Sequence, residues 1–158
     1  MNKFITLIFY AFFVINCSEK KESKDEYLPI LEDMNNEEVS LDTYKENVLI
    51  LNLWATWCKP CIAEFESLEK SKSNYLDKKV KIVAISNENH DKIKEFIERR
   101  ERDLEFLKLN ADLNYFGAYS LPTTIVFDKE GKESFRIASG IDFASQNFVQ
   151  KILDLEKL

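Results

Sequence analysis

Two cysteines separated by two residues form the part of the sequence best suited to covalent chemistry, Cys58-Lys59-Pro60-Cys61. We expect them in the first turn of a helix, where unpaired backbone N–H groups and the helix dipole stabilise the thiolate of the more exposed cysteine, Cys58. Cys61, three residues later, lies on nearly the same side of that helix and could close a disulfide with Cys58. Pro60 is tolerated because an N–H in the first turn has no helical acceptor. The spacing predicts a dithiol that is reversibly oxidised.

The residues on either side of the dithiol predict a strand before it and a helix after it. Val48 to Trp54 is nearly continuous in apolar residues, which indicates a strand buried on both faces. From Cys58 to about Tyr75, apolar side chains recur at helical spacing, at Ile62, Phe65 and Leu68. Such a junction would fix both thiols at one end of a buried strand.

The remaining pattern predicts one α/β domain over residues 27–158, a mixed central sheet flanked by helices on both faces. Short strands flanking a turn are expected between Tyr27 and Leu41. Further strands are expected at Val80–Ile85, Phe106–Leu109, Thr123–Phe127 and Ser134–Ile137. Helices are expected after a cap at Asn87 or Asn89, over Ala111–Tyr119, and from Asp142 to Leu158. Asp128 to Gly131 suits a hairpin turn.

Composition narrows the function classes. The chain has 158 residues, a formal net charge of -6 and 45% hydrophobic residues, so a packed core is expected rather than disorder. The acidic balance argues against nucleic acid, whose binding depends on Lys and Arg displacing counterions. Three cysteines are too few for a disulfide framework, so each needs its own explanation.

The first cysteine follows a short apolar segment. Lys3 precedes an uncharged run from Phe4 to Ile15, too short to span a bilayer and typical of a signal peptide over residues 1–16. The segment resembles a bacterial lipoprotein signal, which implies lipid attachment at Cys17 and a polar tether over residues 17–26. The alternatives are a cleaved secretory signal or an uncleaved anchor. All three place the domain outside the cytoplasm, in the periplasm or cell envelope.

Other uses of Cys58 and Cys61 fit less well. A structural zinc site needs about four ligands. Besides Cys58 and Cys61, the candidate ligands in this chain are Cys17, His90 and carboxylates, so we expect no metal site. His90 has no recognisable partner and is expected at a helix start or on the surface. Covalent haem attachment needs His after the second cysteine, where this chain has Ile62. A purely structural disulfide would close a loop of only four residues, which gives a small entropic gain.

The segment Trp54-Ala55-Thr56-Trp57-Cys58-Lys59-Pro60-Cys61 resembles the active-site signature of the thioredoxin superfamily. With its N-terminal signal, the chain is most similar to the TlpA/ResA-like extracytoplasmic thiol-disulfide oxidoreductases. The similarity begins near Val39 and includes Ser120 to Thr124 and the turn from Asp128 to Lys132. It implies a thioredoxin-like fold. Asn52 stands where cytoplasmic thioredoxins carry a buried aspartate that assists proton transfer, so that base is missing.

Glu64 is the candidate replacement. On a helix with about 100° per residue it lies near -60° from Cys61, at the margin of the apolar face, where desolvation would raise the pKa of a carboxyl group. The resemblance implies that a glutamate here manages the thiol protons. An ordinary solvated glutamate is the alternative.

The substrate is expected to contact the residues around the dithiol. The resemblance implies a cis peptide bond at Pro122, opposite the cysteines, with the backbone of Leu121 pairing to an extended substrate segment. Trp57 would shield Cys58 on the exposed rim. Lys59 and Pro60, between the cysteines, complete the expected substrate-binding set.

Together these features predict a membrane-tethered extracytoplasmic thiol-disulfide oxidoreductase that mainly reduces protein disulfides. Its expected partners are disulfide-containing proteins, with apocytochrome c as a candidate, a membrane thiol reductase as electron donor, and the membrane through a lipid anchor. No separate cofactor is needed. The alternatives are an oxidase or isomerase of protein disulfides, a thiol peroxidase, and a copper-delivery protein on the same fold.

Overall fold

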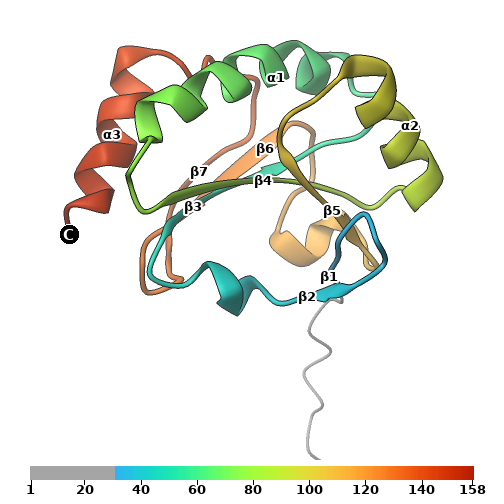
Figure 1. Ribbon diagram of the computed structural model, residues 1–158, viewed down its shortest axis with the longest axis horizontal. Helices are drawn as coiled ribbons and strands as arrows, with labels where there is room; N and C mark the ends of the chain where they lie inside the picture. The colour runs from blue at the N-terminus through green and yellow to red at the C-terminus, as the bar shows by residue number, and fades with distance from the viewer. Residues whose placement is uncertain (1–30) are drawn as a thin grey trace, which may run out of the picture.

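The computed structural model describes residues 31–158 (Figure 1). The predicted signal peptide (residues 1–16), the tether (residues 17–26) and Cys17 lie outside the described residues, as do residues 27–30 of the predicted domain. Within residues 31–158, no helix is long and apolar enough to cross a membrane.

A seven-stranded mixed sheet forms the centre of the molecule, in the order β2-β1-β5-β4-β3-β6-β7. The strands are β1 (Leu31–Glu32), β2 (Glu38–Val39), β3 (Val48–Leu53), β4 (Val80–Ser86), β5 (Glu105–Leu109), β6 (Thr123–Phe127) and β7 (Glu133–Ile137). The pairs β3–β4 and β4–β5 are parallel, whereas β3–β6, β6–β7, β1–β5 and β1–β2 are antiparallel. Strand β3 therefore lies between β4 and β6, which confirms the predicted mixed sheet with a buried strand ahead of the dithiol.

Three α-helices, α1 (Lys59–Ser71), α2 (His90–Arg100) and α3 (Gln146–Glu156), lie along the same side of the sheet (Figure 1). The opposite face is covered by the 3-10 helices η1 (Leu41–Tyr44) and η3 (Leu113–Phe116). Both faces are thus covered, as predicted for the α/β class, but by different kinds of helix.

Side chains of β3 alternate between two cores. Val48 and Ile50 pack in the cluster beneath the α-helices, while Leu49, Leu51 and Leu53 pack in the cluster beneath η1 and η3. Every residue of β3 is buried. The unbroken apolar run in the sequence therefore has a direct cause, because this strand is in contact with a core on each side.

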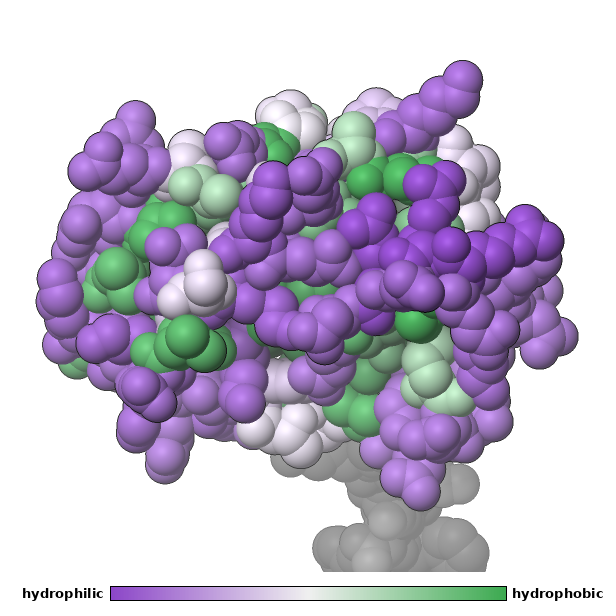
Figure 2. All heavy atoms as spheres, turned by 45° about the horizontal axis from the view of Figure 1, so that its top comes forward, coloured by the Kyte–Doolittle hydropathy of each residue, from purple (hydrophilic) through white to green (hydrophobic). Residues whose placement is uncertain are grey.

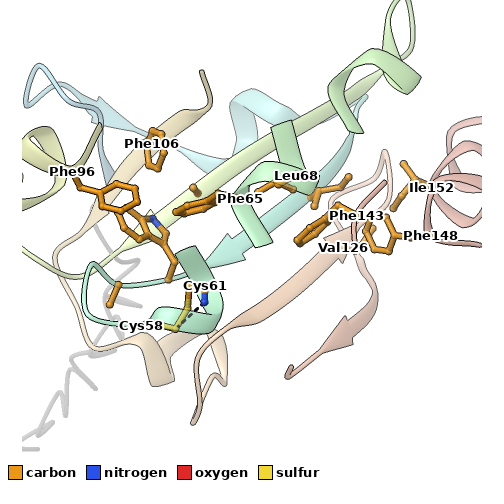
Figure 3. Close-up of a cluster of buried hydrophobic side chains, with 14 of the residues drawn as sticks. Cys58, Cys61, Phe65, Leu68, Phe96, Phe106, Val126, Phe143, Phe148 and Ile152 are labelled. Atoms are coloured by element: carbon orange, nitrogen blue, oxygen red, sulfur yellow. Dashed lines mark hydrogen bonds between the residues drawn. A yellow bond between two sulfur atoms is a disulfide. The ribbon is translucent and has the colours of Figure 1, made fainter. Parts of the chain in front are cut away.

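Aromatic rings fill the core next to the dithiol (Figure 3). Trp54, fully buried just after β3, has its ring centroid 5.1 Å from that of Phe65 on α1, 4.7 Å from Phe96 on α2 and 5.5 Å from Phe106 on β5. Figure 3 shows Phe65 and Leu68 following Cys58 and Cys61 along α1 toward Phe143 and Ile152. Packing of this ring cluster fixes α1 against the sheet.

The outer surface above the α-helices is mainly hydrophilic and carries only separate small apolar patches (Figure 2). On α1, for example, Lys59, Glu66 and Lys70 are exposed, whereas Phe65 and Leu68 are buried. This division is the one expected of an amphipathic helix packed by a single face.

Several element boundaries differ from the sequence prediction. The first helix ends at Ser71 and continues to Tyr75 only as the 3-10 helix η2 (Lys72–Tyr75). The helix predicted over residues 111–119 is the single turn η3, capped at its start by Asp112 and ended by Gly117 with φ of 65°. The last helix begins at Gln146 rather than Asp142, because Asp142 to Ser145 form a turn. Asn89, rather than Asn87, caps α2 through its side chain.

Candidate active site

Cys58 and Cys61 form a disulfide, with an Sγ–Sγ distance of 2.00 Å and Cα atoms 5.3 Å apart (Figure 3). Cys58 is the N-cap of α1, and its Sγ accepts the backbone N–H of Cys61 at 3.3 Å. Cys61 is fully buried, while Cys58 retains 4% exposure. The predicted order holds: Cys58 lies at the helix terminus, where the dipole stabilises an anion, and Cys61 lies behind it.

The residues between and before the cysteines are at the surface. Lys59 and Pro60 are exposed, with Pro60 in the first turn of α1 as expected. Trp57 is 71% exposed beside the buried Cys58. This agrees with the expectation of an aromatic side chain on the rim of the site.

Glu88, from the loop that follows the neighbouring strand β4, holds the loop before the dithiol. One carboxylate oxygen accepts the backbone N–H of Thr56 at 2.6 Å, and the other accepts its hydroxyl at 2.9 Å. Glu88 lies in the connection from β4 to α2, next to the start of that helix. Sequence reasoning missed this residue, and no local motif marks it, since its partner lies on a different loop.

Glu64 lies deeper than its helical angle indicated. The residue is only 5% exposed, its Oε1 accepts Asn52 Nδ2 at 2.8 Å, and its Oε2 accepts the backbone N–H of Ile141 at 3.2 Å. Burial raises the pKa of this carboxyl to about 6, and the hydrogen bonds from Asn52 and Ile141 partly oppose that rise. Cys61 precedes it by three residues on α1, a spacing that puts Cβ atoms about 5–6 Å apart on a helix. The arrangement suits a proton acceptor for the Cys61 thiol.

Leu121 and Pro122 precede β6 and are joined by a cis peptide bond, as the resemblance implied. Pro122 is buried and Leu121 half-buried. Thr123 donates its hydroxyl to the carbonyl of Ser120 at 2.7 Å, which closes the turn around them.

A groove of about 380 Å³ joins this turn to the dithiol loop. Trp57 and Leu121 both line it, and so does Tyr119, whose side chain is 89% exposed. Asn87, Asp112 and Asn114 supply polar groups to the lining. Tyr119 is a second residue that sequence reasoning missed; the only local signal was its position just before Ser120 to Thr124.

His90 is the first residue of α2, so the expectation of a helix-start position is confirmed. The expectation that it has no partner is wrong. Its Nε2 lies 3.0 Å from the carbonyl oxygen of Asp33 and 3.5 Å from a carboxylate oxygen of Glu32, and its side chain is 14% exposed. These contacts join α2 to the β1–β2 hairpin. Among residues 31–158, no group of three or more His, Cys, Asp or Glu side chains is placed to hold a metal ion.

The chain is similar to known thiol-disulfide proteins. A curated relative from Bacillus cereus, "Thiol-disulfide oxidoreductase ResA", is 32% identical over 108 residues, which cover 65% of this chain and 61% of that protein. The ResA protein of Halalkalibacterium halodurans is 28% identical over 94% of this chain and 85% of its own length. For the first of these relatives, the aligned part is thus less than two thirds of its full length.

Solved structures show the same fold. A thiol:disulfide interchange protein from Bacteroides sp. superposes with a TM-score of 0.69 at 24% identity, covering 80% of this chain and 86% of that one. StoA from Bacillus subtilis gives a TM-score of 0.62 at 15% identity, covering 80% of this chain and 93% of that one. The predicted thioredoxin-like fold and the resemblance to ResA proteins are confirmed. The AhpC/TSA family model matches residues 26–134, and the chain therefore belongs to the AhpC/TSA family.

Proposed function

We propose that this protein is a thiol-disulfide oxidoreductase that mainly reduces disulfides in extracytoplasmic proteins. The observation that carries the proposal is the Cys58–Cys61 disulfide at the N-terminus of α1, with one sulfur at the helix end and the other buried behind it. The ResA names of the curated relatives support the same class of reaction.

The reaction begins with the reduced dithiol. The Cys58 thiolate attacks one sulfur of a substrate disulfide, forming a Cys58–substrate bond while the other substrate sulfur leaves as a thiolate. The Cys61 thiol then loses its proton, and its thiolate attacks Cys58 Sγ. The Cys58–Cys61 disulfide forms and the first substrate sulfur leaves as a second thiolate, so two electrons have passed to the substrate.

Glu64 takes the proton from Cys61 in this scheme. A carboxyl with a pKa of about 6 is mainly ionised at neutral pH, yet it accepts a proton more readily than a solvated glutamate does. Its position three residues beyond Cys61 on α1 supports this role.

Substrate binding is assigned to Trp57, Lys59, Pro60, Leu121 and Pro122. The exposure of the first three residues and the groove shared by Trp57 and Leu121 support it. An extended substrate segment would pair with the backbone of Leu121, and Tyr119 would extend the same surface.

The cellular setting follows from the N-terminal segment. Lipid attachment at Cys17 would tether residues 27–158 to the membrane outside the cytoplasm, within the periplasm or cell envelope. There a membrane thiol reductase would reduce the oxidised protein again. An apocytochrome c is one candidate substrate. Radiolabelled lipid incorporation, lost in Cys17→Ser, tests the anchor.

A Cys61→Ser variant tests the reaction class. Without the resolving sulfur, the mixed disulfide at Cys58 should persist and be isolated as a covalent complex with a partner protein. Cys58→Ser is the matched control and should capture nothing. If Cys61→Ser captures no protein while the wild type remains redox-active, reduction of protein disulfides is the wrong class.

The reduction potential of the Cys58–Cys61 pair tests the direction of electron flow. A reduction potential of about -120 mV, typical of the strong oxidant DsbA, would favour an oxidase over a reductase. A markedly more negative value supports the proposed reductase.

A thiol peroxidase is the second candidate, favoured by the AhpC/TSA family match. The pairing of Cys58 with a cysteine only three residues away in the same helix turn favours disulfide exchange instead. Peroxide consumption by Cys61→Ser at the wild-type initial rate would support the peroxidase.

A further inference from the structure

Asn52 is buried beneath Glu64 and bonds to it. The side chain projects from β3, is fully buried, and donates Nδ2 to Glu64 Oε1 at 2.8 Å and to Thr124 Oγ1 at 3.2 Å. Strand β3 pairs Asn52 with Thr124 of β6 and with Ala84 of β4. A neutral amide thus occupies the sheet position directly below the carboxyl group.

The other end of this amide is unsatisfied. Asn52 Oδ1 is buried and has no hydrogen-bond donor among residues 31–158. Burying an acceptor without a donor is unfavourable. The observed orientation of the Asn52 amide is therefore stabilised by the hydrogen bond from Nδ2 to the Glu64 carboxylate. Charge-assisted hydrogen bonds are stronger than neutral ones, which accounts for the preference.

Protonation of Glu64 would reverse this preference. A carboxylic acid carries an O–H donor, and an amide turned by half a rotation presents an acceptor in place of a donor. Oδ1 would then accept the Glu64 proton, and the Thr124 hydroxyl could donate to the same oxygen. Asn52 can therefore donate a hydrogen bond to the ionised carboxyl and accept one from the protonated carboxyl. An apolar residue could do neither, and a side chain that only donates could bind only the ionised form.

No other side chain competes for this role among the described residues. The backbone N–H of Ile141 binds Oε2 from the segment after β7, and Thr124 of β6 touches Asn52 rather than the carboxyl. Cys61, three residues earlier on α1, is part of the disulfide, and no charged side chain contributes to the pKa of Glu64. Within residues 31–158, Asn52 is therefore the side chain that hydrogen-bonds the carboxyl, beside the backbone N–H of Ile141.

We propose that Asn52 is a positioning residue that binds Glu64 in both protonation states and so sets its proton affinity. The proposal deepens the proposed role of Glu64 in thiol deprotonation and rests on it for its catalytic meaning. The hydrogen-bond exchange itself is independent of which substrate the dithiol reduces.

The first test uses the wild-type protein in its oxidised form, where neither cysteine carries a proton. The ¹³C shift of the Glu64 carboxyl and the ¹⁵N and ¹H shifts of the Asn52 side-chain amide are followed by NMR against pH. Both should change with one common midpoint. The Asn47 side-chain amide, which donates to the carbonyls of Tyr44 and Lys45, is the internal control and should not follow that midpoint. An Asn52 amide that does not respond when Glu64 titrates overturns the proposal.

Variants supply the second test. Asn52→Leu removes the donor, so the Glu64 midpoint should rise by about one pH unit. Asn52→Asp, nearly the same size, puts a second carboxyl beside Glu64, and the pair should titrate in two separated steps. Ile50→Val, on the same strand in the core beneath α1, removes a methyl group and no hydrogen bond, so it controls for loosened packing and should keep the wild-type midpoint. An unchanged Glu64 midpoint in either folded Asn52 variant contradicts the proposal.

The pH profile of disulfide reduction separates the two proposals. In Asn52→Leu the pH profile should shift to higher pH, as the Glu64 midpoint does. In Ile50→Val the profile should stay at the wild-type pH. If Asn52 controls the midpoint but Glu64→Gln reduces disulfides at the wild-type rate, the catalytic role of Glu64 fails while the Asn52–Glu64 coupling stands.

Discussion

Glu88 binds Thr56 through both carboxylate oxygens, at 2.6 Å to the backbone nitrogen and 2.9 Å to the hydroxyl. The carboxylate is largely buried, with 8% of the side chain exposed. Thr56 lies two residues before Cys58, so this contact connects the β4–α2 loop directly to the loop that carries the nucleophile. The geometry of the dithiol thus depends on a residue from a separate part of the chain.

Replacing Glu88 should loosen that loop. Glu88→Ala leaves a partly buried N–H and a hydroxyl of Thr56 without their acceptor, so the free energy of unfolding should fall by about 1–2 kcal/mol. Urea denaturation measures this change. Glu95→Ala, which removes an exposed carboxylate paired with Arg99 on α2, is the control and should change stability by no more than about 0.5 kcal/mol. Equal losses in the two variants would mean that the Thr56 contact adds no stability.

Stability should depend on pH through Glu64. Its pKa is raised to about 6 from 4.5, so between those pH values the folded protein binds a proton that the unfolded chain has lost. The stabilisation is complete below about pH 4.5 and is lost as the pH rises through 6, a difference of about 2 kcal/mol. Subtracting the urea-derived stability of Glu64→Gln from that of the oxidised wild type at each pH isolates this contribution. A difference that stays flat from pH 4 to 7 would contradict the raised pKa.

The two thiols of the reduced protein should differ in reactivity. Cys58 lies at the N-terminus of α1 and is the more exposed of the pair, while Cys61 is fully buried. Brief treatment with iodoacetamide followed by peptide mass spectrometry should therefore find Cys58 alkylated at least about tenfold faster, because the thiolate is the reactive form. Comparable modification of both cysteines in folded protein would argue against their assigned roles.

Exposed aromatic side chains should matter for protein substrates but not for small ones. Trp57 and Tyr119 line the same groove beside the dithiol. Trp57→Ala and Tyr119→Ala should each lower the rate of protein-disulfide reduction by about tenfold, since aromatic contacts dominate interface energies. Reduction of a small aromatic disulfide should change much less.

Leu76→Ala provides the matched control for the groove. Leu76 is 72% exposed but lines a different cavity, together with Tyr75 and Leu104. Its replacement should leave both rates unchanged. If Leu76→Ala slows protein reduction as much as Trp57→Ala, the aromatic groove is not the docking surface.

Local sequence determined the chemistry and most of the elements. The apolar run from Val48, the cysteine spacing and the periodicity through Leu68 each depend on neighbours along the chain, so the strand–helix junction and the position of Cys58 at a helix terminus followed from them. Glu64 was identified from the resemblance, and helical geometry placed it only at the margin of the buried face.

Tertiary structure alone decided what surrounds those residues. The strand order places β3 between β4 and β6, and this brings Asn52 against Glu64 and Thr124. Glu88 and Thr56, 32 residues apart, meet for the same reason, since they follow adjacent parallel strands. Burial of a carboxyl and the partners of an amide depend on such long-range packing, which no local periodicity encodes.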